Sequence, residues 1–183
     1  KKIFVGMGEC HVAWPRLHWN YRTDGIYRSD DSGETWKHLG MKELMYISKI
    51  KSDPRDSNIV YLGALGDLAN NSNDRGLYKS IDGGDSWKKI HFENDNTGVI
   101  DLAINNNNPD ELYAAYWEVR RHYFETYSGG DHSSIYRSLD AGKTWTPIHT
   151  NKGFSSLPLG KISISMADDR LWALVQSAEK GLY

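Results

Sequence analysis

Two glutamates of this sequence could supply acid–base chemistry. Glu9 and Glu118 leave the short segments 3–7 and 112–117, whose residues are typical of β-strands. Cleavage of a glycosidic bond uses two carboxyl groups, one as acid and the other as base or nucleophile. A solvated acid or an arginine partner explains either glutamate more simply, so no catalytic set is assigned. The same holds for three further acids near the same predicted face, Glu93, Asp95 and Asp101.

Aromatic and arginine side chains are concentrated at two long connections, 10–24 and 118–133. Aromatic rings offer stacking faces, and guanidinium groups offer planar forks for carboxylates, which together suit a sugar or a peptide. An equally good interpretation is that these loops pack on one another or on a neighbouring domain. The candidate ligand-binding residues are Trp14, Arg16, Trp19, Trp117, Arg120 and Arg121.

A metal or cofactor is not expected. Cys10, His11 and His18 lie close together, but their spacing matches no recurring pattern of metal ligands, and they are best interpreted as ordinary loop residues. Cys10 is the only cysteine, so an internal disulfide is impossible and the cysteine count does not indicate a compartment. His38, His91 and His149 each follow the same repeated segment, which indicates a shared structural position and not a site.

Charge and hydropathy exclude two classes of partner. The 183 residues contain 22 basic and 24 acidic side chains, interspersed along the chain, with a net charge of −2. Nucleic-acid binding needs a basic patch, so no nucleic-acid partner is expected. The sequence has no apolar run long enough to span a bilayer, so membrane insertion is not expected either.

An internal repeat organises the chain. Residues 25–36, 76–87 and 134–145 share the pattern [GS]-[IL]-Y-[RK]-S-x-D-x-G-x-[ST]-W, and residues 181–183 match its opening. The tyrosine and tryptophan of each copy are nine residues apart, which predicts two strands joined by one invariant tight turn. The later copies are each preceded by two further strand-like segments, and the first copy by one, at 3–7, so a complete unit is predicted to contain four short strands.

The polar residues of the repeat are interpreted as a folding device. The aspartates are expected to accept backbone N–H bonds within the turn, and the glycines to take a positive φ. The serines add hydroxyl bonds, and the tryptophans are predicted to be buried between sheets. A calcium loop is disfavoured because the spacing of its ligands is absent. These residues are Ser29, Asp31, Gly33, Trp36, Ser80, Asp82, Gly84, Trp87, Ser138, Asp140, Gly142 and Trp145.

Four-stranded units at intervals of 51 (Tyr27 to Tyr78), 58 (Tyr78 to Tyr136) and 47 residues (Tyr136 to Tyr183) predict an all-β fold, a β-propeller of four-stranded antiparallel blades. The predicted blades are a partial first blade at 1–40, blades at 41–91 and 92–149, and a partial fourth at 150–183. Because a blade cannot bury both of its faces alone, the remaining blades of a longer parent protein are expected as partners. The long loops are expected to lie opposite the tight turns.

The repeat resembles the Asp box, or bacterial neuraminidase repeat, of sialidases, sortilin-type receptors and two-propeller xyloglucanases. With the segments Val-Gly-Met-Gly-Glu at 5–9 and Trp-Glu-Val-Arg-Arg at 117–121, the chain is most similar to secreted bacterial proteins described as glycosyl hydrolase-like or sortilin-like. The resemblance implies a protein that is secreted, periplasmic or at the cell surface. It implies a scaffold that binds a carbohydrate or a protein on its loop face; the alternative is a glycoside hydrolase of the xyloglucanase-like or sialidase-like kind. It supplies no established catalytic residues to carry over. The arginine triad and the Tyr/Glu nucleophile of sialidases cannot be assigned in this sequence either.

Overall fold

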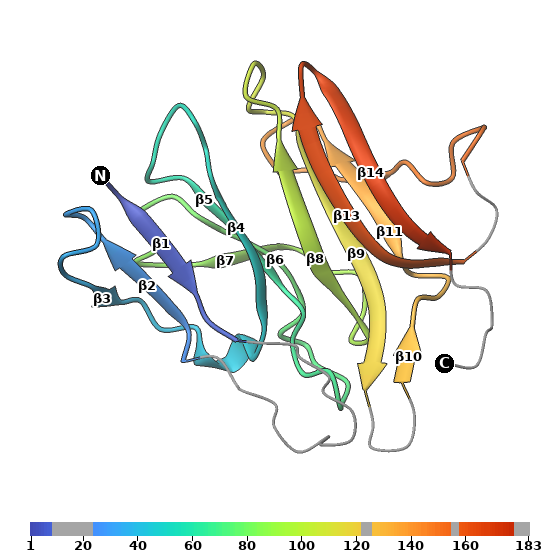
Figure 1. Ribbon diagram of the computed structural model, residues 1–183, viewed down its shortest axis with the longest axis horizontal. Coiled ribbons are helices and arrows are strands. Elements are labelled where there is room, and N and C mark those ends of the chain that lie inside the picture. Colours follow the sequence, from blue (N-terminus) through green and yellow to red (C-terminus); the bar gives the residue numbers. More distant parts are fainter. Residues whose placement is uncertain (9–23, 122–125, 155–157, 178–183) are drawn as a thin grey trace.

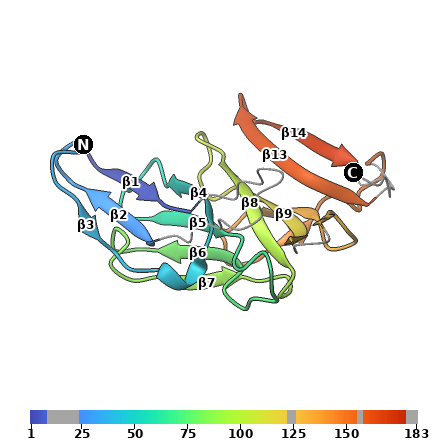
Figure 2. The same cartoon turned by 60° about the horizontal axis from the view of Figure 1, so that its bottom comes forward.

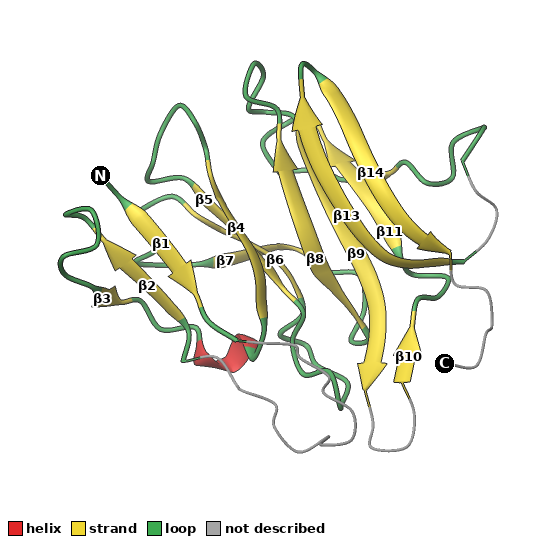
Figure 3. Cartoon of the chain, viewed as in Figure 1, coloured by secondary structure: helices red, strands yellow, loops and turns green. Residues whose placement is uncertain are grey.

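The protein forms four antiparallel β-sheets that stand side by side along the chain (Figure 1). The computed structural model describes residues 1–8, 24–121, 126–154 and 158–177. Apart from a single 3-10 turn, η1 (Lys42–Leu44), the regular structure of these residues is all strand (Figure 3). No helix among them is long or apolar enough to cross a membrane. The predicted β-propeller architecture is confirmed.

Each sheet is one blade, and the strands follow one another in chain order from the inner to the outer edge. Blade 1 has three strands, β1 (Ile3–Gly6), β2 (Ile26–Ser29) and β3 (Lys37–His38). Blade 2 has four, β4 (Ile47–Ser52), β5 (Val60–Ala64), β6 (Gly76–Ser80) and β7 (Lys88–His91). Blade 3 contains β8 (Thr97–Ile104), β9 (Leu112–Arg121), β11 (Ser134–Ser138) and β12 (Thr146–Pro147). A short additional strand, β10 (Thr126–Ser128), pairs with the end of β9, and blade 4 is the hairpin β13 (Leu159–Ala167) and β14 (Arg170–Ser177).

The sheets lie next to one another (Figure 2), and apolar cores between neighbouring sheets hold the blades together. Strands β5 and β9 consist largely of buried residues, because both of their faces are covered by neighbouring blades. One cluster joins blades 1 and 2, a second joins blades 2 and 3, and a third joins blades 3 and 4. Burying each large apolar side chain contributes roughly 1.5–3 kcal/mol, so these clusters fix the order and spacing of the blades. Central members of the three clusters are Leu62, Val99 and Ile162.

The Asp-box turns have one geometry in all three copies. In blade 2, Ser86 donates its backbone N–H to Asp82 Oδ1 at 2.9 Å and its hydroxyl to Oδ2 at 2.5 Å, while Gly84 donates to Ser80 Oγ at 2.7 Å. The glycines at the third turn position have φ of +102°, +92° and +86° in blades 1 to 3, a region that favours glycine. The equivalent bonds recur at Asp31 and Asp140.

These hydrogen bonds make the Asp boxes sensitive to acid. The bonds from the Ser86 hydroxyl, the Ser86 amide and Ser80 hold the pKa of Asp82 well below its usual range. A carboxyl group with a lowered pKa in the folded state stabilises the protein above its ordinary pKa, and this stabilisation is lost as the pH falls through the folded value. We expect Asp82→Asn to reduce the fall in melting temperature between pH 5 and pH 2. The control is Asp168→Asn in the β13–β14 turn, and equal acid sensitivity of the two variants would contradict this role.

The prediction that the three Asp-box tryptophans are buried is wrong. Trp36 is 45% exposed, and Trp87 and Trp145 are half-buried. Trp87 packs against the cluster between blades 1 and 2, and Trp145 against the cluster between blades 2 and 3. The burial of each tryptophan therefore comes from the blade before it, and no described blade lies on that side of Trp36.

Candidate functional site

The end of the sheets opposite the Asp-box turns carries the longest connections, and we call it the loop face. Strand β9 defines the two ends, because Leu112 pairs with Ser138 beside the Asp box, whereas Ser134, where β11 begins, pairs with Tyr116. Glu118, Arg120 and Arg121 follow Tyr116 and so lie at the loop face. The predicted residues Glu9, Trp14, Arg16 and Trp19, together with Cys10, His11 and His18, lie outside the described residues.

Strand β9 is longer than the sequence predicts, and this changes the role of its last residues. The predicted strand ends at residue 117, but β9 continues to Arg121 because it pairs with β8 on one edge and β10 on the other. Trp117 therefore lies within the strand and is only 3% exposed. It packs with Leu65 and Leu68, so its proposed role as a stacking platform is wrong.

Glu118 is half-buried and is held by the loop between β10 and β11. Its Oε2 accepts a bond from the backbone N–H of His132 at 3.1 Å, and its own N–H donates to Ser133 Oγ at 3.0 Å. Gly130 lies against the carboxylate, and a Cβ there would be 2.3 Å from Oε2. Glu118 is thus a positioned carboxylate that holds the 130–133 loop against β9.

A second carboxylate, Glu93, reaches the same loop from the connection between blades 2 and 3. Its Oε1 lies 3.2 Å from His132 Nδ1, and its Oε2 accepts a short hydrogen bond from the Tyr136 hydroxyl. Tyr136 also contacts the ring of His91, whose Nδ1 is 2.7 Å from the Tyr116 hydroxyl. Burial lowers the pKa of His91, which keeps this imidazole neutral near pH 7. Glu93 and Glu118 therefore meet at one residue, His132.

The predicted arginines Arg120 and Arg121 contact other residues of the protein, Arg120 within a polar network between blades 2 and 3. Arg120 donates to the side-chain oxygens of Asn96, at 2.6 Å, and of Asn71. Asn71 in turn donates to Asp95 Oδ2 at 2.8 Å. The Arg121 guanidinium lies over the ring of Trp117, with its carbon 5.8 Å from the ring centre. Both arginines are thus engaged within the protein and do not stand free as carboxylate forks.

This network rests on a residue that sequence reasoning missed. Arg75 is completely buried, and its guanidinium donates to the backbone carbonyls of Asn96 at 2.9 Å, Asp67 at 2.5 Å and Val119 at 3.2 Å. Burial lowers the pKa of Arg75 to about 10, which leaves it charged at neutral pH. The sequence did contain a signal for Arg75. It directly precedes the second copy of the motif, where the other copies are preceded by Asp24 and Ser133.

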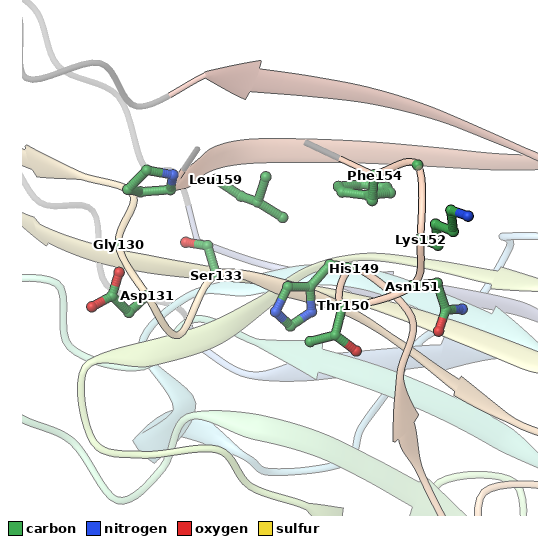
Figure 4. Close-up of a pocket in the computed structure, with 11 residues that line it drawn as sticks. Gly130, Asp131, Ser133, His149, Thr150, Asn151, Lys152, Phe154 and Leu159 are labelled. Atoms are coloured by element: carbon green, nitrogen blue, oxygen red, sulfur yellow. The ribbon is translucent and has the colours of Figure 1, made fainter. Parts of the chain in front are cut away.

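A pocket of about 430 Å³ opens at the loop face between blades 3 and 4 (Figure 4). Phe154 and Leu159 lie on one side of it, and Ser133 and His149 lie on the other (Figure 4). His149 Nδ1 is 2.6 Å from the Ser134 hydroxyl, which fixes the ring at the wall of the pocket. Further polar lining comes from Asp131, Thr150, Asn151 and Lys152. The pocket therefore combines an apolar side with a rim of hydrogen-bonding groups.

Two other expectations are corrected by the structure. Asp101 is not at the loop face: it is buried within β8, where a bulge directs it between blades. The three histidines do not all share one position, since His38 pairs with Tyr27 whereas His91 pairs with Leu77, one residue before the equivalent tyrosine. Among the described residues, no group of three His, Cys, Asp or Glu side chains could hold a metal ion.

Known proteins are similar to this sequence over most of its length. A xyloglucanase from Paenibacillus sp is 30% identical over 166 residues, which are 80% of this chain and 15% of that protein. The xyloglucanase of Hypocrea jecorina (strain QM6a) is 25% identical over 173 residues, 84% of this chain and 19% of its own. The chain thus spans less than a fifth of the length of these relatives. Its similarity to them identifies it as a glycoside hydrolase-like propeller.

Solved structures show the same fold. An ancestral GH74 enzyme superimposes with a TM-score of 0.55 at 22% identity, covering 76% of this chain and 17% of the enzyme. The GH74 enzyme of Niastella koreensis gives 0.53 at 20% identity, covering 75% and 20%. The family model Sortilin-Vps10, described as "Sortilin, neurotensin receptor 3", matches residues 24–172, and the chain therefore belongs to this family.

Proposed function

We propose that the protein binds a polysaccharide of the xyloglucan type on its loop face, as part of a glycoside hydrolase. The observation that carries this proposal is the pocket between blades 3 and 4, in which Phe154 faces a polar rim. A sugar ring has apolar C–H faces that pack on aromatic side chains and hydroxyl groups that need precisely placed donors and acceptors. The substrate class, xyloglucan, is taken from the relatives of this chain, which are xyloglucanases.

Binding and cleavage are assigned to different parts of the protein. Glu118 and Glu93 both accept hydrogen bonds within the loop face, which suits residues that position a loop better than residues that exchange a proton with substrate. Asp131 is exposed at the pocket and is the described carboxylate best placed to contact a ligand. We therefore infer that the described residues bind the sugar and that the acid–base pair lies outside them, with Glu9 as one candidate member.

A pure binding scaffold is the second candidate function. It is favoured by the same engagement of Glu93 and Glu118, since no free pair of carboxylates faces the pocket within the described residues. The two functions separate in one experiment, in which the purified protein is incubated with xyloglucan and new reducing ends are measured alongside binding. Release of reducing ends supports the hydrolase, whereas binding without release supports the scaffold. Under either function, we propose that the protein acts outside the cytoplasm, secreted, in a periplasm or at the cell surface, where polymeric glucans are found.

Phe154→Ala is expected to weaken binding of a xyloglucan oligosaccharide about tenfold, which corresponds to about 1.4 kcal/mol. The reason is loss of the aromatic face of the pocket, because stacking and burial of one ring contribute on this scale. The measurement is isothermal titration calorimetry. Phe92→Ala, which removes an exposed ring that does not line the pocket, is the control. Equal affinities of the two variants would rule out the pocket as the sugar site.

A further inference from the structure

A chain of hydrogen-bonding side chains runs from Glu93 to the pocket between blades 3 and 4. Glu93 Oε2 accepts a short hydrogen bond from the Tyr136 hydroxyl. The Ser134 hydroxyl, two residues earlier on β11, bonds to the same phenol oxygen and lies 2.6 Å from His149 Nδ1. Ser134 is buried and does not line the pocket, whereas His149 forms part of the pocket wall (Figure 4). The chain therefore ends on an imidazole that a ligand can reach.

The carboxylate sets the direction of this chain. A carboxylate only accepts hydrogen bonds, so Tyr136 donates to Glu93. Burial, together with the bond to Glu93, raises the pKa of Tyr136, and the phenol therefore keeps its proton at neutral pH. The Ser134 hydroxyl donates its only proton to the Tyr136 oxygen, so toward His149 Nδ1 it can only accept. In the neutral imidazole Nδ1 thus carries the proton, and Nε2 is left as an acceptor.

The packing around Tyr136 holds the middle of the chain in place. Its ring centre lies 4.7 Å from that of His91 in blade 2 and 5.2 Å from that of Tyr116 in blade 3. Tyr116 is completely buried, and its hydroxyl lies 2.7 Å from His91 Nδ1. The Tyr136 phenol cannot leave Glu93 without displacing these rings, since protein interiors are closely packed. The fold therefore fixes the chain before any ligand is present.

The serine of this chain departs from the repeat. Ser134 stands where the first two copies of the motif have Gly25 and Gly76, so only the third copy has a hydroxyl at this position. In blade 2 the equivalent tyrosine, Tyr78, donates instead to the backbone carbonyl of Asp74, at 2.9 Å. Two blades fold with glycine at this position, so the hydroxyl is not required to build a blade. Its position beside a pocket indicates a role in that pocket.

We propose that His149 binds the sugar in this pocket by accepting a hydrogen bond from a sugar hydroxyl at Nε2. Ser134, Tyr136 and Glu93 are positioning residues, which hold the imidazole in the tautomer that accepts. Nε2 has no hydrogen-bond partner within the described part of the chain, and Phe154 lies on the opposite side of the pocket (Figure 4). A sugar ring between them packs on Phe154 and donates to His149. The ligand rests on the proposed function, whereas the tautomer of His149 does not.

The tautomer is tested by NMR of protein labelled with ¹⁵N at histidine, measured at pH 8. Two-bond ¹⁵N–¹H correlations distinguish a protonated Nδ1 from a protonated Nε2, and His149→Gln identifies the signal. We expect a proton on Nδ1 in the unchanged protein and on Nε2 in Tyr136→Phe, because the Ser134 hydroxyl then donates to Nδ1. Tyr127→Phe, which removes an exposed hydroxyl outside the chain, is the control and should change nothing. A proton on Nε2 in the unchanged protein, or no change in Tyr136→Phe, would overturn the proposal.

Titration calorimetry with a xyloglucan oligosaccharide separates this inference from the proposed function. We expect Ser134→Gly, which restores the residue of the other copies, and His149→Leu to weaken binding about three- to tenfold, the range of one hydrogen bond. His38→Leu, an exposed histidine of blade 1, is the control. If Phe154→Ala weakens binding but Ser134→Gly and His149→Leu do not, the pocket binds sugar without His149 and the inference is wrong. No binding by the unchanged protein would contradict the proposed function and the role of His149 with it, even where the tautomer is as expected.

Discussion

Replacing Arg75 by alanine is expected to lower the free energy of unfolding by about 3–5 kcal/mol. The guanidinium is completely buried and bonds to three backbone carbonyls from three segments, those of Asp67, Asn96 and Val119. Alanine leaves these acceptors buried without partners and leaves a cavity, both of which destabilise the fold. Lysine is expected to recover only part of the loss, because a single ammonium cannot match the planar fork of arginine.

The measurement for Arg75 is equilibrium unfolding in urea. Arg170→Ala at the exposed start of β14 is the control, because it removes the same type of side chain from the surface. A decrease in the free energy of unfolding of less than about 1 kcal/mol, as for a surface substitution, would contradict this prediction. It would show that water replaces the guanidinium at the three carbonyls. The variant also loosens the 66–75 connection, so the Arg120–Asn71 contact at the loop face is expected to be lost with it.

The fold was predictable because the repeat encodes local structure. The constant spacing from tyrosine to tryptophan reflects a turn closed by hydrogen bonds within seven residues, as between Ser80 and Ser86. Such bonds depend on neighbours in sequence and recur wherever the motif recurs. The order of the strands within each blade follows their order in the chain.

The site was less predictable because its geometry depends on contacts between blades. Glu118 was expected at the mouth of a loop, but pairing with β8 and β10 extends β9 beyond it. Glu118 therefore contacts Gly130 and His132. Phe154 and its pocket had no signal in the sequence, since they lie in a connection that varies between copies. A segment that does not recur in the chain cannot be aligned with another copy, so its position in the fold cannot be inferred from the repeat.

Asp101 shows how far one side chain can depart from its sequence interpretation. The bulge between Val99 and Asp101 directs its carboxylate out of blade 3 toward both neighbours. It pairs with Lys49 of blade 2 at 2.9 Å and accepts bonds from the Ser163 hydroxyl and the Ile164 amide of blade 4, each at 3.0 Å. A bulge inserts one residue into an alternating pattern, which sequence periodicity does not reveal. Asp101 thus joins three blades through one carboxylate.

Asp101→Ala is expected to destabilise the protein by about 3–5 kcal/mol, because it leaves the Ile164 amide and the Lys49 ammonium without their buried partner. Asp101→Asn keeps an acceptor oxygen but removes the charge, so a smaller loss is expected. Burial alone would raise the pKa of Asp101, but the Ile164 amide, Lys49 and the Leu102 amide together hold it below its ordinary value. The stabilisation is therefore present above about pH 4, the ordinary pKa of an aspartate, and is lost as the pH falls below it.

A double-mutant cycle on Asp101→Ala and Lys49→Met, measured by urea unfolding at pH 7, separates the ion pair from the other bonds of the carboxylate. Lys49 is 39% exposed, so solvent screens the pair, and we expect a coupling of no more than about 1 kcal/mol. Most of the loss in Asp101→Ala should then persist in the Lys49→Met background, because the bonds to blade 4 do not involve the lysine. If Lys49→Met instead abolished the effect of Asp101→Ala, the contact to blade 2 alone would account for the stabilisation, and Asp101 would not hold blade 4 in place.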